Sequence, residues 1–355
     1  MTPTAPIRVL VVDDSPTIRT LLRAMLEEDS GIKVVGEAAD GADAVRQAVK
    51  LMPDLITMDV VMPLMDGLEA TKEIMISAPT PILIVAAVEN RSAMDLSFDA
   101  TQAGALGVVA KPENPLAAGF AEKREELLSM VKAMAQVKVV RRWGSRPGRL
   151  TSRTDGAALP SVSAEDRQVV LIGTSTGGPA ALRRIFMDLP RDFAAPVLVV
   201  QHIARGFVAG LASWLNAGCS LHVKVAEEGE DLLPRTVYLA PDDRHLGLRS
   251  DGRALISDRP PIGGFRPSAT FLFETAAEAC GSKAVGVILT GMGNDGVAGL
   301  KALHGAGATV LAQDERSSIV YGMAQEAVKE GVVDSVLPLE SIASKLTELV
   351  SGVRA

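Results

Sequence analysis

Residues 7–16 read IRVLVVDDSP, an apolar run that ends in two aspartates and continues into a typical helix start. Four more apolar, β-branched runs follow, at 34–38, 55–59, 82–87 and 107–110. Amphipathic patterns separate or follow them, at 16–28, 41–51, 67–77 and 115–139. Strands that are apolar along their whole length are typical of a parallel sheet covered on both faces. Five such units predict a doubly wound α/β domain in residues 1–138, with its site beyond the carboxyl ends of the strands.

The character of the chain changes after this domain. Between Arg141 and Arg153 there are five arginines, two glycines and one proline but no acid. Residues 139–166 are therefore expected to be a linker, either a solvated tether or a segment that docks on an acidic partner. A second set of strand candidates then appears, at 169–173, 196–201, 237–240, 285–289, 309–312 and 332–337. Residues 167–355 are expected to form a second doubly wound α/β domain.

The overall composition excludes several classes of protein. The 355 residues carry a formal charge of −7, which argues against nucleic-acid binding because phosphate contacts need clustered Lys and Arg. No apolar run approaches the ~18 residues of a membrane span, and the N-terminus lacks the basic start of a signal peptide. Two distant cysteines, Cys219 and Cys280, fit a reducing compartment. We expect a cytoplasmic protein that binds no nucleic acid and does not insert directly into a membrane.

Charged side chains stand at the ends of three strands of the first domain. Asp13 and Asp14 follow the first strand, Asp59 ends the third, and Lys111 follows the fifth. Because carboxyl ends of parallel strands converge, these four groups are expected to meet. Carboxylates suit Mg2+, and a carboxylate beside Mg2+ and Lys can accept a phosphoryl group. The simpler alternative, that each acid only caps a helix, explains one acid better than it explains the set.

The motifs VVDDS (11–15), MDVVMPLMDG (58–67) and AKP (110–112) resemble a bacterial response-regulator receiver, which is a flavodoxin-like domain. The resemblance implies that Asp59 is the phosphorylated residue and that a histidine kinase is the phosphodonor. It further implies that Asp13 and Asp14 help to hold Mg2+ at Asp59, and that Lys111 contacts the phosphoryl group.

Two positions depart from the receiver pattern. Receivers usually carry Thr or Ser at the end of the fourth strand, where this chain has Ala86. They usually carry Tyr or Phe three residues before the lysine, where this chain has Val108. Ala offers no donor to a phosphoryl oxygen, and Val has no ring that could repack. Phosphorylation is therefore expected to remain possible while the usual route that transmits it is missing.

The second domain opens with VVLIGTSTGGP (169–179), which predicts a strand, a glycine-bounded turn and a helix. In this turn Ser175 would stand at a helix N-terminus, where free N–H groups can stabilise an oxyanion. GTSTG also fits the Gly-x-Ser-x-Gly nucleophile pattern. Taken alone, the turn is equally compatible with a phosphate-binding loop or with a serine that only caps the helix.

A nucleophilic serine needs a general base, and His202 is the first candidate. It ends the apolar run PVLVVQH (196–202), so it is expected at the same edge of the sheet as Ser175. The alternative is a core histidine satisfied by the backbone. His222 and His245 fall in what look like less ordered, polar surroundings.

The segment GMGNDG (291–296) follows another apolar strand and offers Asp295 as the acid that orients the base. The chain order is then Ser, His, Asp, whereas α/β-hydrolases follow the order Ser, acid, His. That order would require His304 with an earlier acid such as Asp243. This alternative is weaker because His304 lies within a helical pattern.

The second domain resembles the catalytic domain of the chemotaxis protein-glutamate methylesterases, through GTSTGG, QHI, YLAPDDRH, RPS and LTGMGNDG. The resemblance implies a Ser175 nucleophile, a His202 base and an Asp295 partner, with Thr176 and Met292 lining the site. Val208, and Ala269 with Thr270, depart from the family pattern and leave fine substrate contacts open.

The same resemblance implies hydrolysis of glutamate γ-methyl esters on the cytoplasmic helices of chemoreceptors, and deamidation of glutamines there. The ester reaction would need no cofactor, and the unphosphorylated receiver would cover the active site. Two alternatives stay open from the residues alone: a docking module without turnover, and a hydrolase of a different carboxylic ester.

Overall fold

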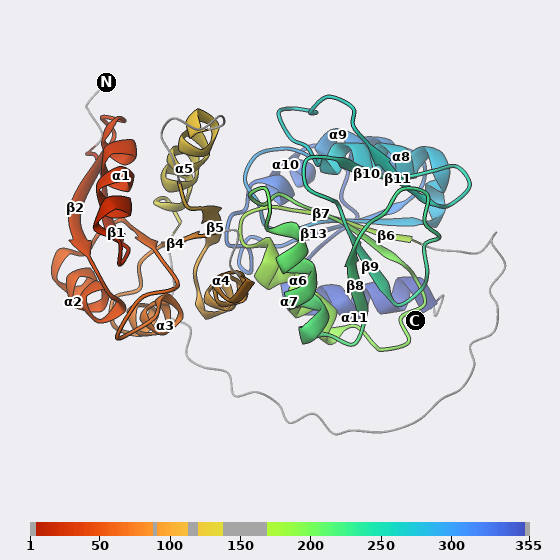
Figure 1. Cartoon of the computed structure of the whole chain (residues 1–355). Helices are drawn as coiled ribbons and strands as arrows, with labels where there is room; N and C mark the ends of the chain where they lie inside the picture. The colour runs from red at the N-terminus through yellow and green to blue at the C-terminus, as the bar shows by residue number, and fades with distance from the viewer. Residues whose placement is uncertain (1–4, 88–90, 113–119, 138–168, 352–355) are drawn as a thin grey trace.

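The computed structural model describes residues 5–87, 91–112, 120–137 and 169–351, and it contains two parallel sheets with helices on both faces (Figure 1). The α/β class expected from the sequence is therefore confirmed. The expected linker at 139–166 lies outside the described residues, as do the expected start and end of the helix at 115–139. Within the described ranges, no helix is both long and apolar enough to cross a bilayer.

The first sheet has the strand order β2-β1-β3-β4-β5, with every neighbouring pair parallel. Its strands are β1 (Ile7–Val12), β2 (Ile32–Ala38), β3 (Leu55–Met58), β4 (Ile82–Ala86) and β5 (Gly107–Ala110). Its helices are α1 (Pro16–Glu27), α2 (Gly41–Leu51), α3 (Gly67–Ser77), α4 (Arg91–Ala103) and α5 (Phe120–Met134). The central strands are buried on both faces, which explains why they read as continuous apolar runs.

The second sheet has the order β14-β13-β12-β6-β7-β9-β8, again with every neighbouring pair parallel. Its strands are β6 (Val169–Thr174), β7 (Val197–Gln201), β8 (His222–Val225), β9 (Thr236–Leu239), β12 (Ala284–Ile288), β13 (Thr309–Gln313) and β14 (Ser335–Leu337). The helices are α6 (Gly178–Asp188), α7 (Val208–Gly218), α8 (Ala269–Ala279), α9 (Val297–Gly305), α10 (Met323–Lys329) and α11 (Leu339–Ser351), with a 3-10 turn at Gly281–Lys283. One face packs against α6, α7 and α11, and the other against α8, α9 and α10 (Figure 1).

A separate antiparallel hairpin, β10 (His245–Leu248) with β11 (Ala254–Ser257), packs against α8. The sequence analysis missed this hairpin and the edge strand β8. It was wrong in expecting little order around His222 and His245, because both begin strands. It was also wrong in expecting polar surroundings for His245, which is completely buried, whereas His222 is exposed. The strands HVKV and HLGL place a polar residue or glycine between apolar ones, so they lack the continuous apolar run by which the other short strands were recognised. The burial of His245 depends on distant contacts.

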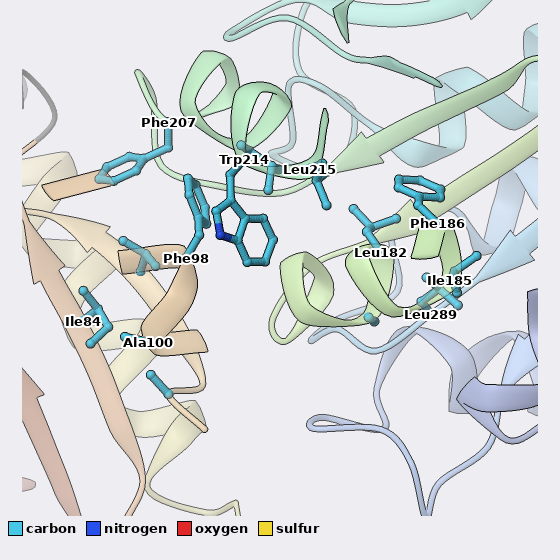
Figure 2. Packing of buried hydrophobic residues seen from close by; sticks show 14 of the residues in the cluster. Ile84, Phe98, Ala100, Leu182, Ile185, Phe186, Phe207, Trp214, Leu215 and Leu289 are labelled. Carbon is cyan, nitrogen blue, oxygen red and sulfur yellow. The ribbon is translucent and has the colours of Figure 1, made fainter. Parts of the chain in front are cut away.

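Helix α4 of the first sheet packs against α7 of the second, through one aromatic side chain (Figure 2). Phe98 is fully buried, with its ring 6.4 Å from that of Phe207 and 5.4 Å from that of Trp214. Trp214 Nε1 donates a hydrogen bond of 2.8 Å to Asp99. Gly210 on α7 allows this approach, since a Cβ there would lie 2.9 Å from Met94 Sδ. The two halves of the chain therefore share one hydrophobic core.

Candidate active site

Parallel strand register brings Ser175 and His202 together at the carboxyl edge of the second sheet. Thr174, the last residue of β6, pairs with Gln201, the last residue of β7. Ser175 and His202 each follow directly, and the His202 N–H donates to the Thr174 carbonyl at 3.0 Å. Asp295 comes from the other side, in the loop after β12, which also pairs with β6. The three residues proposed from the sequence thus follow three adjacent strands.

The imidazole of His202 is held by Asp295 and by a stacked ring. His202 Nε2 lies 2.9 Å from Asp295 Oδ2. Phe265 stacks on the imidazole with ring centroids 4.4 Å apart and an interplanar angle of 12°. The other nitrogen, Nδ1, is buried and has no hydrogen-bond partner among the described residues. Because a carboxylate only accepts, the proton lies on Nε2, and Nδ1 is left as an acceptor.

The carboxylate of Asp295 lies at the N-terminus of α8. Oδ1 accepts hydrogen bonds from Ser268 Oγ at 2.7 Å and from the Thr270 N–H at 3.2 Å. Oδ2 accepts from the Ala269 N–H at 2.7 Å as well as from His202. Burial by itself would raise the pKa of Asp295, but hydrogen bonds from His202, Ser268 and Ala269 outweigh it and lower this pKa to about 2. Asp295 is therefore a permanently ionised partner for the imidazole at neutral pH.

We expect this carboxylate to make folding stability depend on acid. The folded-state pKa of Asp295 is about 2, below its ordinary value of 3.8, so its stabilisation is complete above pH 3.8 and is lost as the pH falls toward 2. The loss amounts to roughly 2 kcal/mol of the free energy of unfolding. Urea unfolding at several pH values, with Asp295→Asn as the reference, measures it. If the difference in the free energy of unfolding between the wild type and Asp295→Asn stays the same from pH 3.8 to pH 2, the low pKa of Asp295 is contradicted.

The backbone around Ser175 forms a tight turn before α6. Gly177 has φ of +79°, a conformation that favours glycine. Gly178 lies so close to Gln201 that a Cβ there would meet its Oε1 at 1.9 Å, while Gln201 Nε2 donates to the Ser175 carbonyl at 2.8 Å. Among the described residues, the N–H groups of Thr176 and Gly177 have no hydrogen-bond acceptor. Two free donors beside the serine can bind an oxyanion.

Two of the alternatives left open by the sequence, the helix cap and the His304–Asp243 pair, do not fit this geometry. The N-cap of α6 is Gly177, with no side-chain cap, so Ser175 is not a helix cap. His304 is about 41% exposed and its Nε2 lies 3.4 Å from Asp334. Asp243 instead binds Arg266 and Arg205, each at 2.7 Å. The structure therefore does not bring His304 and Asp243 together.

Met292 follows Gly291, whose backbone lies against Ser175, and 40% of the Met292 surface is exposed. It lines a cleft of about 670 Å³ between the end of α5 and the segment 315–321. Ile319 of that segment packs against the core of the first sheet. It also lies beside the nucleophile turn, because a Cβ on Gly177 would come within 2.6 Å of Ile319 Cγ1. The first half of the chain therefore contacts a wall of the candidate active site.

The acidic residues of the first sheet also meet as expected. Asp13 and Asp59 are buried, and Lys111 Nζ lies 2.9 Å from Asp13 Oδ2 and 2.7 Å from Asp59 Oδ2. Asp14 is exposed, and one oxygen from each aspartate lies within 4.8 Å of the others. Burial raises the pKa of Asp59 although Lys111 opposes this. Three carboxylates around one point fit Mg2+, which neutralises them.

Ala86 and Val108 lie on the strands next to this cluster. Both are buried, on the adjacent strands β4 and β5. The Ala86 carbonyl accepts the Lys111 N–H at 2.8 Å, so this position supports the lysine through its backbone. It presents no side-chain donor to the site. Val108 belongs to the core that also contains Phe98, at the contact between the two halves of the chain.

Sequence analysis missed the residues that hold the dyad in place, Ser268 and Phe265. Ser268 stands in the quoted RPS motif, directly before a helical pattern, which is the signal of an N-cap. That signal indicates the cap but not its second bond to Asp295. Phe265 follows two glycines in a loop and carries no comparable signal.

Comparison with known proteins divides the chain into the same two α/β domains. Residues 170–346 match the model of the CheB methylesterase family, and residues 9–117 match that of the response regulator receiver domain. Protein-glutamate methylesterase/protein-glutamine glutaminase 4 of Myxococcus xanthus is 50% identical over 350 residues, 98% of each chain. Protein-glutamate methylesterase/protein-glutamine glutaminase 3 of Anaeromyxobacter dehalogenans is 48% identical over 341 residues, which are 96% of this chain and 98% of that protein. The Thermotoga maritima CheB methylesterase catalytic domain is 43% identical, with a TM-score of 0.50 over 52% of this chain and 98% of that structure.

Proposed function

This chain belongs to the CheB methylesterase family and carries an N-terminal receiver domain, and we propose that Ser175, His202 and Asp295 are its catalytic triad. The chain is a protein-glutamate methylesterase and protein-glutamine glutaminase, as its relatives are named over their whole length. The observation that carries the triad is the His202–Asp295 hydrogen bond, which leaves Nδ1 of His202 as the acceptor at the edge where Ser175 stands.

The reaction follows from these positions. His202 Nδ1 takes the Ser175 proton as Oγ attacks the ester carbonyl, and Asp295 stabilises the resulting imidazolium through Nε2–H. The N–H groups of Thr176 and Gly177 hold the oxyanion. The imidazolium then protonates the leaving methoxide, methanol departs, and water hydrolyses the acyl-serine with His202 as base. With a glutamine the leaving group is ammonia, and no cofactor takes part.

We propose chemoreceptor cytoplasmic helices as the substrate and the cytoplasm as the place of reaction, because the family acts in chemotaxis signalling. A hydrolase of a different ester is the alternative. Release of radiolabelled methanol from methylated receptor membranes, with and without a phosphodonor, tests the substrate. Turnover of a simple ester without any methanol release from receptors would favour the alternative.

For the receiver we propose Asp59 as the phosphorylated residue and a histidine kinase as the donor. Asp13, Asp14 and Asp59 would hold Mg2+, which supplies positive charge for the incoming phosphoryl group. Lys111 already lies within 3 Å of Asp13 and Asp59 and would pair with a phosphoryl oxygen. Removal of Mg2+ with a chelator would therefore leave the esterase reaction intact and block phosphorylation.

We expect phosphorylation to stimulate the esterase only weakly, about twofold to threefold. An added phosphoryl group changes a local charge, and a switch needs an element that responds to it. Ala86 has no hydroxyl to bind the group and Val108 has no ring to move, while Phe98 remains locked between Phe207 and Trp214. The measurement is the rate of methanol release with and without acetyl phosphate.

Asp59→Asn is the control for this measurement, because it removes the acceptor and leaves the fold of the receiver in place. Its rate should equal that of the untreated enzyme under both conditions. Strong stimulation of the wild type that disappears in Asp59→Asn would overturn the expectation and reveal a transmission route that does not pass through Ala86 and Val108.

A further inference from the structure

One buried histidine outside the triad forms hydrogen bonds to both ends of the loop 260–268, which contacts His202 and Asp295. His245, the first residue of β10, is completely buried. Its Nε2 lies 3.1 Å from the Pro260 carbonyl, and its Nδ1 accepts the Ser268 N–H at 3.2 Å. We propose that His245 is a positioning residue that holds His202 and Asp295 in their catalytic geometry, an inference that rests on the proposed function of the triad.

The partners of His245 fix its protonation and its orientation. A carbonyl only accepts and a backbone N–H only donates, so the proton of the neutral ring lies on Nε2 and Nδ1 is the acceptor. Both nitrogens are thereby satisfied in a site without access to water. Phe271 stacks on the ring, with centroids 4.8 Å apart and an interplanar angle of 28°. His245 therefore has a single favourable arrangement, as a supporting residue requires.

At one end of the loop, this arrangement reaches Asp295 through Ser268. The Ser268 N–H is fixed by His245, while Ser268 Oγ accepts from the Thr270 N–H at 3.1 Å and donates to Asp295 Oδ1 at 2.7 Å. Loss of the His245 acceptor would leave a buried N–H unpaired and free the serine to shift. Asp295 would then lose one of the hydrogen bonds that direct its Oδ2 to His202.

At the other end, the same side chain anchors the loop that carries Phe265, whose ring stacks on His202. The loop contains Gly263 and Gly264, both with positive φ, of 60° and 89°. Glycines leave a backbone free to adopt several conformations, so this loop needs fixed ends. With Pro260 and Ser268 both bound to one rigid ring, the position of Phe265 over the catalytic imidazole is defined.

Two amide substitutions separate positioning from simple packing. In His245→Asn, the side-chain oxygen can take the place of Nδ1 and accept the Ser268 N–H. In His245→Gln, the longer side chain reaches Pro260 but leaves the Ser268 N–H without its acceptor. Both variants lose the stacked ring, so they are matched for that loss. The protein is the full-length chain, and the substrate is methylated receptor membranes.

We expect His245→Gln to lower kcat about 10- to 100-fold with KM within a factor of about two, as is typical when a supporting shell is lost. His245→Asn keeps an acceptor for the Ser268 N–H but loses the bond to Pro260, so it should lower kcat less than His245→Gln, by no more than about tenfold. His222→Gln, on the exposed end of β8, is the control for replacing a histidine. Equal kcat in the Asn and Gln variants, or a loss confined to KM, would overturn the proposal.

A second variant keeps the test decisive if the Gln protein does not fold. Phe265→Leu removes only the ring over His202 from a partly exposed loop, and it should lower kcat about tenfold at unchanged KM. Unchanged kcat in Phe265→Leu would then contradict the proposal. Ser175→Ala is run in parallel, since full activity in that variant would reject the triad itself, separately from the role of His245.

Discussion

Replacement of Ser175 by alanine is expected to abolish methanol release, with kcat falling roughly a million-fold toward the residual activity of the binding site. The Ser175 hydroxyl is the proposed nucleophile, and His202 Nδ1, which has no hydrogen-bond partner among the described residues, is the proposed base at the same edge of the sheet. The hydrogen bonds of Ser175 among the described residues use its backbone N–H and carbonyl, so the free energy of unfolding should change by less than about 0.5 kcal/mol. Radiolabelled methanol release and urea unfolding measure the two quantities.

The control for this variant is Ser250→Ala, a serine in the exposed turn between β10 and β11. It makes the same chemical change far from the sheet edge and should keep full activity. Near-normal methanol release from Ser175→Ala would remove the nucleophile from the mechanism. It would then leave direct attack by water, with His202 as base, as the remaining explanation of turnover.

The positions of the reacting groups could be predicted because they depend on local patterns and one topological rule. Ser175, His202 and Asp295 each follow an apolar strand, and parallel strands present their carboxyl ends at one edge. The same rule brings Asp59 and Lys111 together in the first sheet. To predict either cluster, it is enough to know which segments are parallel strands and which residues follow them.

The residues that hold these groups in place could not be predicted, because they act across long sequence distances without a repeating pattern. His245 touches Ser268 across 23 residues, and Ser268 touches Asp295 across a further 27. A polar side chain such as His245 is normally expected near solvent, and only its two backbone partners make its burial favourable. In the sequence, Phe98 is likewise one apolar residue of an amphipathic helix, and nothing local predicts that it packs against Phe207 and Trp214 in the other half of the chain.

Replacement of Asp295 by asparagine is expected to lower kcat about a thousand- to ten-thousand-fold, by removing the charge opposite the imidazolium. The carboxylate accepts four hydrogen bonds, from His202, Ser268, Ala269 and Thr270. An amide has only one oxygen, so its NH2 group must face donors on one side. If the NH2 replaces Oδ2, it faces His202 Nε2 and drives the imidazole proton to Nδ1, where it can no longer accept from Ser175.

If the NH2 instead replaces Oδ1, His202 keeps its tautomer but loses the negative charge, and the Thr270 N–H keeps only Ser268 Oγ as its acceptor. Either outcome slows the reaction. The first also leaves the Ala269 N–H without its acceptor, which lowers the free energy of unfolding by about 1–3 kcal/mol. Asp188→Asn, which breaks only an exposed ion pair with Arg184, is the matched control. Full activity in Asp295→Asn would mean that His202 works without a charged partner, and the low pKa of Asp295 would then serve the stability of α8 alone.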